Sequence, residues 1–252
     1  LNFFSVGLPG LFVAALMYYT VREPARKGVE QDLAEIPLKN VLSYLLQRKQ
    51  AYLGHILGIS IFIMVVYALN LWGPTYFIRT FEYSRPEAGW VFGLVMISAG
   101  TFGLLTAGLL SDKLMARGIH DAYIRMILFS MLAIMPCAIA LGFIENDKLA
   151  IVAMAFAIYF SAFQGGISGG ALQLMTHNRM RGQVTALFLL AANLIGLGLG
   201  PTVIAMVTDY IFMDEAAIGK SIALCTLLLC PTGAFILWRS MPAIQKQLTE
   251  QG

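Results

Sequence analysis

The amino-acid sequence predicts an all-α integral membrane protein, and three observations support this fold class. The chain has 252 residues, of which 58% are hydrophobic and 12% are charged, whereas soluble domains carry roughly 25% charged residues. It contains seven long apolar runs, each about long enough to cross a hydrocarbon core of ~30 Å as a helix. Most of its basic residues lie in every second gap between these runs. A soluble domain with buried helices would not contain seven consecutive runs with so little charge.

The apolar runs set the order of the predicted helices. The first run ends at a long polar segment, and six full spans follow it. The sequence opens inside the first run, without a Met or a basic leader segment, and we expect it to be a truncated chain or the product of a partial gene. The runs cover residues 1–20, 53–78, 88–111, 126–144, 149–176, 184–208 and 221–238.

The distribution of lysine and arginine predicts which loops face the cytoplasm. Thirteen of the 17 lie in alternate polar segments, and the positive-inside rule places those segments on the cytoplasmic side. We therefore expect residues 21–50, 112–125, 177–183 and 239–252 to be cytoplasmic. These thirteen are Arg22, Arg26, Lys27, Lys39, Arg48, Lys49, Lys113, Arg117, Arg125, Arg179, Arg181, Arg239 and Lys246, and the remaining four are Arg79, Arg85, Lys148 and Lys220.

Residues 21–50 form the one long polar stretch. Pro37 suits the first turn of a helix, and the apolar residues after it recur at helical spacing on one face. We expect an amphipathic helix on the cytoplasmic membrane surface, packed on the neighbouring span. Its apolar stripe contains Leu38, Val41, Leu42, Leu45 and Leu46.

Glycine and proline are frequent within the spans. Pairs such as Gly89/Gly93 and Gly196/Gly200 place small residues on one helical face, where backbones can approach closely. The prolines should kink four spans. Packing alone explains each motif, but together they fit helices that rock against each other. The prolines are Pro74, Pro136, Pro201 and Pro231.

The sequence contains no pattern typical of an enzyme, a metal site or a cofactor site. The glycine string from Gly196 to Pro201 lies inside an apolar helical run and follows no strand, so it is not a dinucleotide fingerprint. The three histidines, His55, His120 and His177, have no metal-ligand spacing. We predict no cofactor and no metal, and the net charge of +3 is explained by loops near anionic lipid rather than by nucleic acid.

One polar segment resembles a known family motif. Residues 108–118, GLLSDKLMARG, resemble the signature loop of the major facilitator superfamily, in which a Gly and an Asp are followed by basic residues. Gly108, Asp112, Lys113 and Arg117 match it, and Met115 stands where the family usually has Gly. The loss of this Gly is common in the second of the two copies of the loop that family members contain. The second copy joins spans eight and nine of twelve.

That resemblance implies a C-terminal six-helix bundle of a major facilitator fold, preceded by the end of span six. Residues 1–20 would be the end of span 6, residues 21–50 the central cytoplasmic loop, residues 51–240 spans 7–12 and residues 241–252 a cytoplasmic tail. Four further segments look like the spinster-type branch, whose substrates include lysophospholipids and sphingoid phosphates. These segments are TVREP, LWGPTYF, NRMRGQV and NLIGLGLGP.

The same loop supplies a candidate conformational latch. Asp112 lies at a predicted helix end, where a carboxylate can cap another helix or pair with a base such as Arg181. A bond formed in only one rocking state would act as a latch, while the alternative is a simple topological charge cluster. The candidate latch residues are Gly108, Asp112, Lys113, Arg117 and Arg181.

The polar residues within the spans are neutral or aromatic. No Asp, Glu, Lys or Arg lies in the core of a full span, so in proton-coupled transport the titrating group would be in the other half; facilitated diffusion needs none. If these residues line a substrate cavity, its neutral and aromatic wall suits an amphiphile or an uncharged solute. Each residue could instead join neighbouring helices. The candidate cavity residues are Tyr67, Asn70, Trp72, Tyr76, Gln164 and Asn193.

These observations predict half of a secondary transporter in the inner cell membrane. It would move a small organic or lipid-like solute by alternating access, with the missing N-terminal half as its partner. Two alternatives stay open: a non-transporting membrane scaffold or receptor, and an intramembrane enzyme. A catalytic dyad within the spans would favour the enzyme, and we find none in the sequence.

Overall fold

A computed structural model describes residues 2–21 and 36–251, which belong to two compact units, Leu1–Glu35 and Ile36–Gly252. In the first unit, the first predicted run forms helix α1, Asn2–Thr20. Its apolar part, Gly10–Thr20, is shorter than a full span. The predictions that concern residues 22–35, including most of the TVREP segment, lie outside the described residues.

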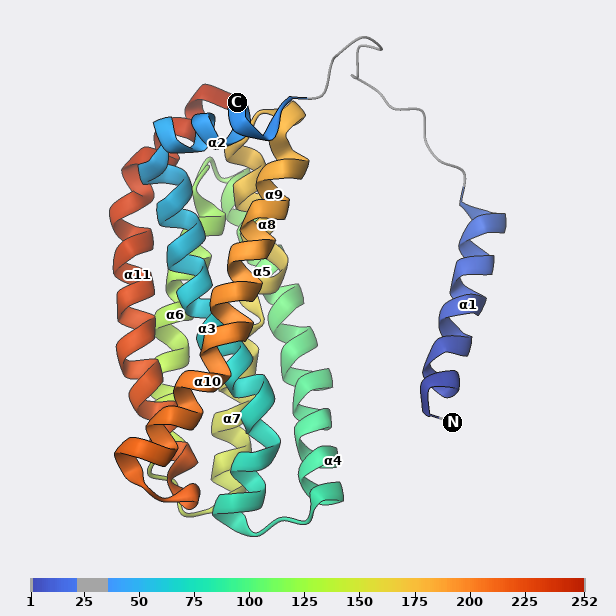
Figure 1. Cartoon of the computed structure of the whole chain (residues 1–252), viewed down its shortest axis with the longest axis vertical. Helices are drawn as coiled ribbons and strands as arrows, with labels where there is room; N and C mark the ends of the chain where they lie inside the picture. Colours follow the sequence, from blue (N-terminus) through green and yellow to red (C-terminus); the bar gives the residue numbers. More distant parts are fainter. Residues whose placement is uncertain (1, 22–35, 252) are drawn as a thin grey trace. The chain divides into compact units, whose positions relative to one another are not determined.

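The second unit is a helical bundle (Figure 1). Six of its helical stretches are long and apolar enough to cross a membrane, which confirms the predicted number of full spans. All regular elements in the described residues are helical. The six stretches are Lys49–Phe81, Arg85–Ala116, Ala122–Ala140, Asp147–Met175, Asn178–Phe212 and Glu215–Glu250.

Several spans consist of more than one helical element. The bundle contains α2 (Leu38–Gln47), α3 (Lys49–Phe81), α4 (Arg85–Val95), η1 (Met96–Gly100), α5 (Thr101–Ala116), α6 (Ala122–Ala140), α7 (Asp147–Ser161), α8 (Phe163–Met175), η2 (Asn178–Met180), α9 (Arg181–Ala191), η3 (Ala192–Leu197), α10 (Gly198–Met206), η4 (Val207–Phe212), η5 (Glu215–Ala217) and α11 (Ile218–Gln251). The elements η1, η3 and η4 are π-helical turns. Such turns occur mostly as single interruptions of α-helices and often at functional sites.

The four predicted kink prolines all lie inside helices: Pro74 in α3, Pro136 in α6, Pro201 in α10 and Pro231 in α11.

The two ends of the bundle differ in charge. The end with α2 and the C-terminus (Figure 1), here called the basic end, also holds the α5–α6 and α8–α9 connections. Its described residues include ten basic and three acidic side chains, and the opposite end has four basic and seven acidic ones. The alternation along the sequence therefore corresponds to two ends of one bundle. The acids are Asp112, Asp121 and Glu250 at the basic end, and Glu82, Glu87, Glu145, Asp147, Asp209, Asp214 and Glu215 at the other.

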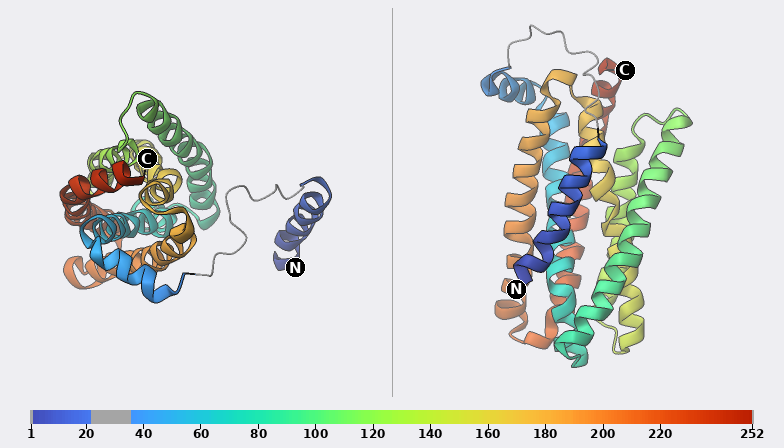
Figure 2. Two further views of the ribbon diagram at one scale, coloured as in Figure 1. Left: turned by 90° about the horizontal axis from the view of Figure 1, so that it is seen from above. Right: turned by 90° about the vertical axis from the view of Figure 1, so that its right-hand side faces the viewer.

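The spans differ in how far the rest of the bundle covers them. In their most apolar stretches, α3 is 67% buried, whereas the α4–α5 span is 17% buried and the α9–α10 span 28% buried. Helix α8 packs against both α5 and α9, so it lies between these two least covered spans (Figure 2). The bundle thus exposes most apolar surface on two spans that flank α8.

Helices α3 and α11 approach closely because small residues lie at their contact. A Cβ atom added to Gly58 would lie 3.0 Å from the carbonyl oxygen of Gly233, and one added to Gly54 would collide with Ser240.

Helix α2 lies at the basic end of the bundle (Figure 1). It buries Val41 and Leu45 and leaves Leu38, Leu42 and Leu46 exposed.

Candidate functional site

The clearest polar feature near the middle of the bundle joins two predicted cavity residues. The Tyr67 hydroxyl on α3 donates a hydrogen bond to Oδ1 of Asn193 over 3.3 Å. Nδ2 of Asn193 donates in turn to the Leu189 carbonyl oxygen over 2.8 Å. Tyr67 is half-buried, and Asn193 lies exposed in the π turn η3. The structure therefore places an accessible neutral polar pair where α3 meets the α9–α10 span.

Asn70 lies one helical turn after Tyr67 on α3, and therefore on nearly the same helix face. Its Oδ1 atom is buried and has no hydrogen-bond partner within the described residues. Pro74 lies four residues later inside the same helix and has no N–H to donate to the Asn70 carbonyl group. A buried side-chain acceptor without a donor, such as Oδ1 of Asn70, costs about 1–3 kcal/mol. It is therefore a feature that needs an explanation.

Two other predicted cavity residues bond within the bundle instead. Tyr76 is wholly buried, and its hydroxyl donates to the Leu141 carbonyl oxygen over 2.9 Å. Nε1 of Trp72 donates to the Pro201 carbonyl oxygen over 2.9 Å. Burial and an internal acceptor thus make Tyr76 a core residue in this structure, contrary to its expected place on a cavity wall. Trp72 joins α3 to α10 while it stays partly exposed.

Gln164 lies at a break in its span. Helix α7 ends at Ser161, α8 begins at Phe163, and Gln164 is the second residue of α8. It is half-buried, and Gly165 and Gly166 after it are exposed. Gly166 faces Leu104 of α5, whose Cδ1 atom would lie 3.0 Å from an added Cβ. The glycines after Gln164 thus pack towards α5, whereas the Tyr67–Asn193 bond joins α3 to η3.

The predicted latch residues lie at the basic end, and each polar partner recorded for them is local. Oδ1 of Asp112 accepts a hydrogen bond from the Tyr123 hydroxyl over 3.1 Å. Nε of Arg181 donates to the Thr176 carbonyl oxygen over 3.1 Å. Lys113 and Arg117 are exposed, and open space surrounds the position that a Cβ atom would take at Gly108. In this conformation, Asp112 and Arg181 therefore have separate partners.

Sequence reasoning missed Tyr123 and a buried group of hydrogen bonds at the basic end, formed by Tyr52, Met175 and Thr176. The Tyr52 hydroxyl donates to the Met175 carbonyl oxygen over 2.7 Å, and Thr176 donates to the hydroxyl of the same tyrosine over 3.4 Å. These hydrogen bonds join the first turns of α3 to the end of α8. No spacing in the sequence marks these pairs, because their members are far apart in the chain or belong to no motif.

The opposite end holds polar contacts of its own. Nη2 of Arg79 and Oε2 of Glu215 form an ion pair at 3.1 Å. The Tyr83 hydroxyl donates to Oδ2 of Asp147 over 2.8 Å, and this bond, with a smaller effect of burial, raises the pKa of Tyr83. These contacts join the end of α3 to η5, and the turn after α3 to the start of α7.

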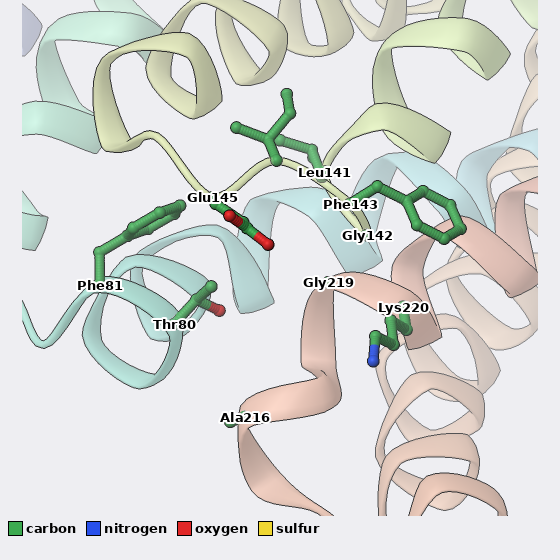
Figure 3. Close-up of a pocket in the computed structure, with 10 residues that line it drawn as sticks. Thr80, Phe81, Leu141, Gly142, Phe143, Glu145, Ala216, Gly219 and Lys220 are labelled. Atoms are coloured by element: carbon green, nitrogen blue, oxygen red, sulfur yellow. The ribbon is translucent and has the colours of Figure 1, made fainter.

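A hollow of about 470 Å³ lies beside these contacts (Figure 3). Thr80, Glu145 and Lys220 are among the residues that line it. None of the six predicted cavity residues contributes to it, and it lies in the seam between the end of α3, the α6–α7 turn and the start of α11. We therefore assign it to the packing of the bundle end rather than to the candidate transport site.

A bundle of six membrane-spanning helices, with neutral polar groups near the middle of α3 and two poorly covered spans, has the form of a membrane transport domain. Residues 2–201 match the Major Facilitator Superfamily. Because this match covers most of the chain, the protein belongs to that family, a family of transporters rather than enzymes. It is a multi-pass membrane protein.

Comparisons with individual proteins agree with this assignment. The chain is 26% identical over 211 residues to an "MFS-type efflux pump" of Mycolicibacterium smegmatis. The aligned region covers 82% of this chain and 48% of that protein. The fold is similar to the crystal structure of a bacterial homologue of the human lysosomal transporter Spinster, inward-facing and unoccupied. The TM-score is 0.59 at 18% identity, over 98% of this chain and 59% of the other. The occupied form gives a TM-score of 0.53 at 17% identity, over 98% and 57%.

The chain therefore spans about half the length of the relatives it matches. The prediction of half a major facilitator fold is confirmed, and both crystal structures are of a bacterial Spinster homologue.

Proposed function

We propose that this chain is the C-terminal half of a secondary transporter. It moves a small organic or amphiphilic solute across the inner cell membrane by alternating access. Its relatives are about twice as long, and one of them is named an efflux pump, which supports the movement of a solute across the membrane. In this proposal, a preceding N-terminal bundle supplies the other wall of the cavity, as alternating access around a midplane site requires. The basic end faces the cytoplasm, because basic loops favour that side.

The observation that carries the proposal is the group of neutral polar atoms around Tyr67, Asn70 and Asn193. The buried Oδ1 atom of Asn70 lacks a donor within the described residues, and the Tyr67–Asn193 bond beside it is accessible. Because Oδ1 is buried in this conformation, the neighbouring side chains would have to move before a donor group of a bound solute could bond to it. We assign Tyr67, Asn70 and Asn193 to the cavity wall contributed by α3 and η3, and Gln164 to a neighbouring part of the wall at the α7–α8 break. Trp72 supports this wall through Pro201.

The exposure of two spans supports a second bundle as their partner. The α4–α5 and α9–α10 spans are the least buried of the six, and they carry large exposed side chains such as Ile97, Phe102, Leu190 and Leu194. Lipid could cover these side chains. A second bundle that contacts both spans would also cover the accessible Tyr67–Asn193 bond on the α9–α10 span, whose polar atoms lipid cannot satisfy.

The segment at residues 108–118, which the structure shows as the last turns of α5 and the two residues after it, acts as the latch in this proposal. Asp112 is held by Tyr123 in the conformation described here. Rocking of the bundle would exchange this hydrogen bond for a charged partner such as Arg181, which here donates to the Thr176 carbonyl. Gly108, Lys113 and Arg117 lie on the same end of α5, and Gly108 leaves room for an approaching helix.

Efflux from cells preloaded with the neutral dye Nile red tests the proposed function. The chain is expressed alone, or together with the N-terminal bundle that this proposal places before it. We expect the chain alone to release dye no faster than an empty vector, and the two halves together to release it several-fold faster. Dye release by the chain alone at the rate of the two halves would contradict the proposal.

A further inference from the structure

A shallow groove runs between α3 and α11 at the basic end, on helices other than the two least covered spans. Its volume is about 480 Å³. Helix α3 contributes Lys49, Gln50 and Leu53, and α11 contributes Phe235, Arg239 and Ser240. The predicted cavity and latch residues do not line it.

The groove exists because the two helices touch without side chains between them. Gly54 leaves space for Ser240, and the Ser240 hydroxyl bonds its own helix at the Ile236 carbonyl oxygen over 2.8 Å. The floor of the groove is therefore formed by the small residues Gly54 and Ser240, and the Ser240 hydroxyl already has a hydrogen-bond acceptor. The longer side chains of Lys49, Leu53, Phe235 and Arg239 form the two edges.

The charge in the groove is unbalanced. Lys49 and Arg239 are exposed, and no acidic residue lines the groove among the described residues. An adjoining recess of about 510 Å³ adds Arg48 and Lys246, of which Lys246 lies 4.0 Å from Glu250. In the described part of the chain, Lys49 and Arg239 form no ion pair with an acid. Two such cations on facing helices favour an anion between them, and the planar guanidinium of arginine suits a phosphate.

The rest of the groove is apolar and continues along the helices away from the charges. Leu53 is 38% exposed, Leu57 one turn further is 42% exposed, and Phe235 is 58% exposed. The rings of Phe235 and Trp238 lie 6.3 Å apart between centroids. Exposed tryptophan next to basic residues is typical of the level at which lipid headgroups meet the hydrocarbon. Charge at one end and apolar side chains beyond it match one molecule that has both parts.

We propose that this groove is a binding site for an anionic phospholipid of the leaflet at the basic end. Its phosphate lies between Lys49 and Arg239, and one acyl chain lies along Leu53, Leu57 and Phe235. Basic pockets between membrane helices bind lipid headgroups by the same chemistry. The apolar edge distinguishes this site from one for free phosphate.

Native mass spectrometry of the purified chain in detergent tests the proposal. Phosphatidylglycerol and phosphatidylcholine with identical acyl chains are offered in turn. We expect phosphatidylglycerol to be retained at least several-fold better. The Lys49→Gln/Arg239→Gln variant should lose about thirtyfold of its affinity for phosphatidylglycerol, roughly fivefold for each charge removed. The Lys49→Arg/Arg239→Lys variant preserves both charges and should retain the lipid, which separates loss of charge from loss of folding.

The matched control is Lys113→Gln/Arg117→Gln, which removes the same number of charges from the C-terminal end of α5. It should bind phosphatidylglycerol as the wild type does, and glycerol 3-phosphate should not displace the lipid at a comparable concentration. Equal retention of the two lipids, an equal loss in the control, or displacement by glycerol 3-phosphate would each overturn the proposal.

Discussion

The Tyr67 hydroxyl donates a hydrogen bond to the Asn193 side chain over 3.3 Å, and this bond joins the middle of α3 to the π turn of the α9–α10 span. In a π turn the backbone departs from the regular i→i−4 hydrogen bonding, which is one reason such turns recur at functional sites. A second π turn, η1, lies near the middle of the α4–α5 span. The two least covered spans thus share the same local irregularity.

Asn70→Leu should leave the stability of the bundle unchanged or raise it. The wild-type Oδ1 atom is buried without a donor in the described part of the chain, so its removal ends a cost of about 1–3 kcal/mol. Trp72→Phe is the matched control, because it removes the bond to the Pro201 carbonyl and should destabilise the bundle by about 0.5–1.5 kcal/mol. Thermal unfolding of the purified chain in detergent measures both effects. A clear loss of stability in Asn70→Leu would show that Asn70 joins helices within this half.

Asp112→Asn should slow transport by the two-half protein several-fold without changing substrate affinity. The variant can still accept the hydrogen bond from Tyr123 but loses the charge that a latch needs in the other state. Tyr123→Phe removes that bond and keeps the charge, so it should disturb this conformation alone. Rates and half-saturating concentrations of dye efflux distinguish the two variants. A normal rate in Asp112→Asn would reduce Asp112 to a marker of topology.

Asp121 should make the stability of the basic end depend on acid pH. Burial by itself raises the pKa of Asp121, but hydrogen bonds from Arg125 and Gln245, each 2.8 Å long, outweigh it, and the pKa lies below its usual value. A lowered pKa in the folded state stabilises the protein above the unfolded-state value of about 4, and this contribution is lost as the pH falls through the folded-state pKa.

Unfolding temperatures measured between about pH 3 and pH 7 should therefore fall at the acid end in the wild type, and less steeply in Asp121→Asn. Asp112→Asn, at the same end of the bundle, is the charge-matched control. Parallel curves for wild type and Asp121→Asn would contradict the assignment.

Cysteine labelling in intact cells should identify the side that each end faces. After replacement of Cys137, Cys225 and Cys230, Glu145→Cys should react with an impermeant maleimide and Lys113→Cys should not, because basic loops favour the cytoplasm. Reaction of Lys113→Cys in intact cells, with Glu145→Cys reacting only after the cells are opened, would place the Glu145 end on the inside.

The sequence predicts the spans well and the site residues less well, for physical reasons. Apolar length and alternating charge are local properties, so all six full spans and the two differently charged ends could be predicted. The environment of Tyr76 depends on the Leu141 carbonyl, which lies 65 residues away in the chain and is brought near only by the tertiary fold. Likewise, Tyr123 carries no motif that predicts its bond to Asp112. Asn70 could be singled out because Pro74 removes a donor within the same helix.

The concentration dependence of Nile red efflux by the two-half protein with Asn70→Leu tests the cavity assignment most directly. A solute that satisfies the Asn70 acceptor should lose about 1–3 kcal/mol of binding in this variant, so the half-saturating concentration should rise at least several-fold while stability is kept. Tyr83→Phe, which removes a hydrogen bond to Asp147 at the opposite end of the bundle, should leave the half-saturating concentration unchanged. An unchanged value in Asn70→Leu would contradict the claim that this half forms one wall of the transport cavity.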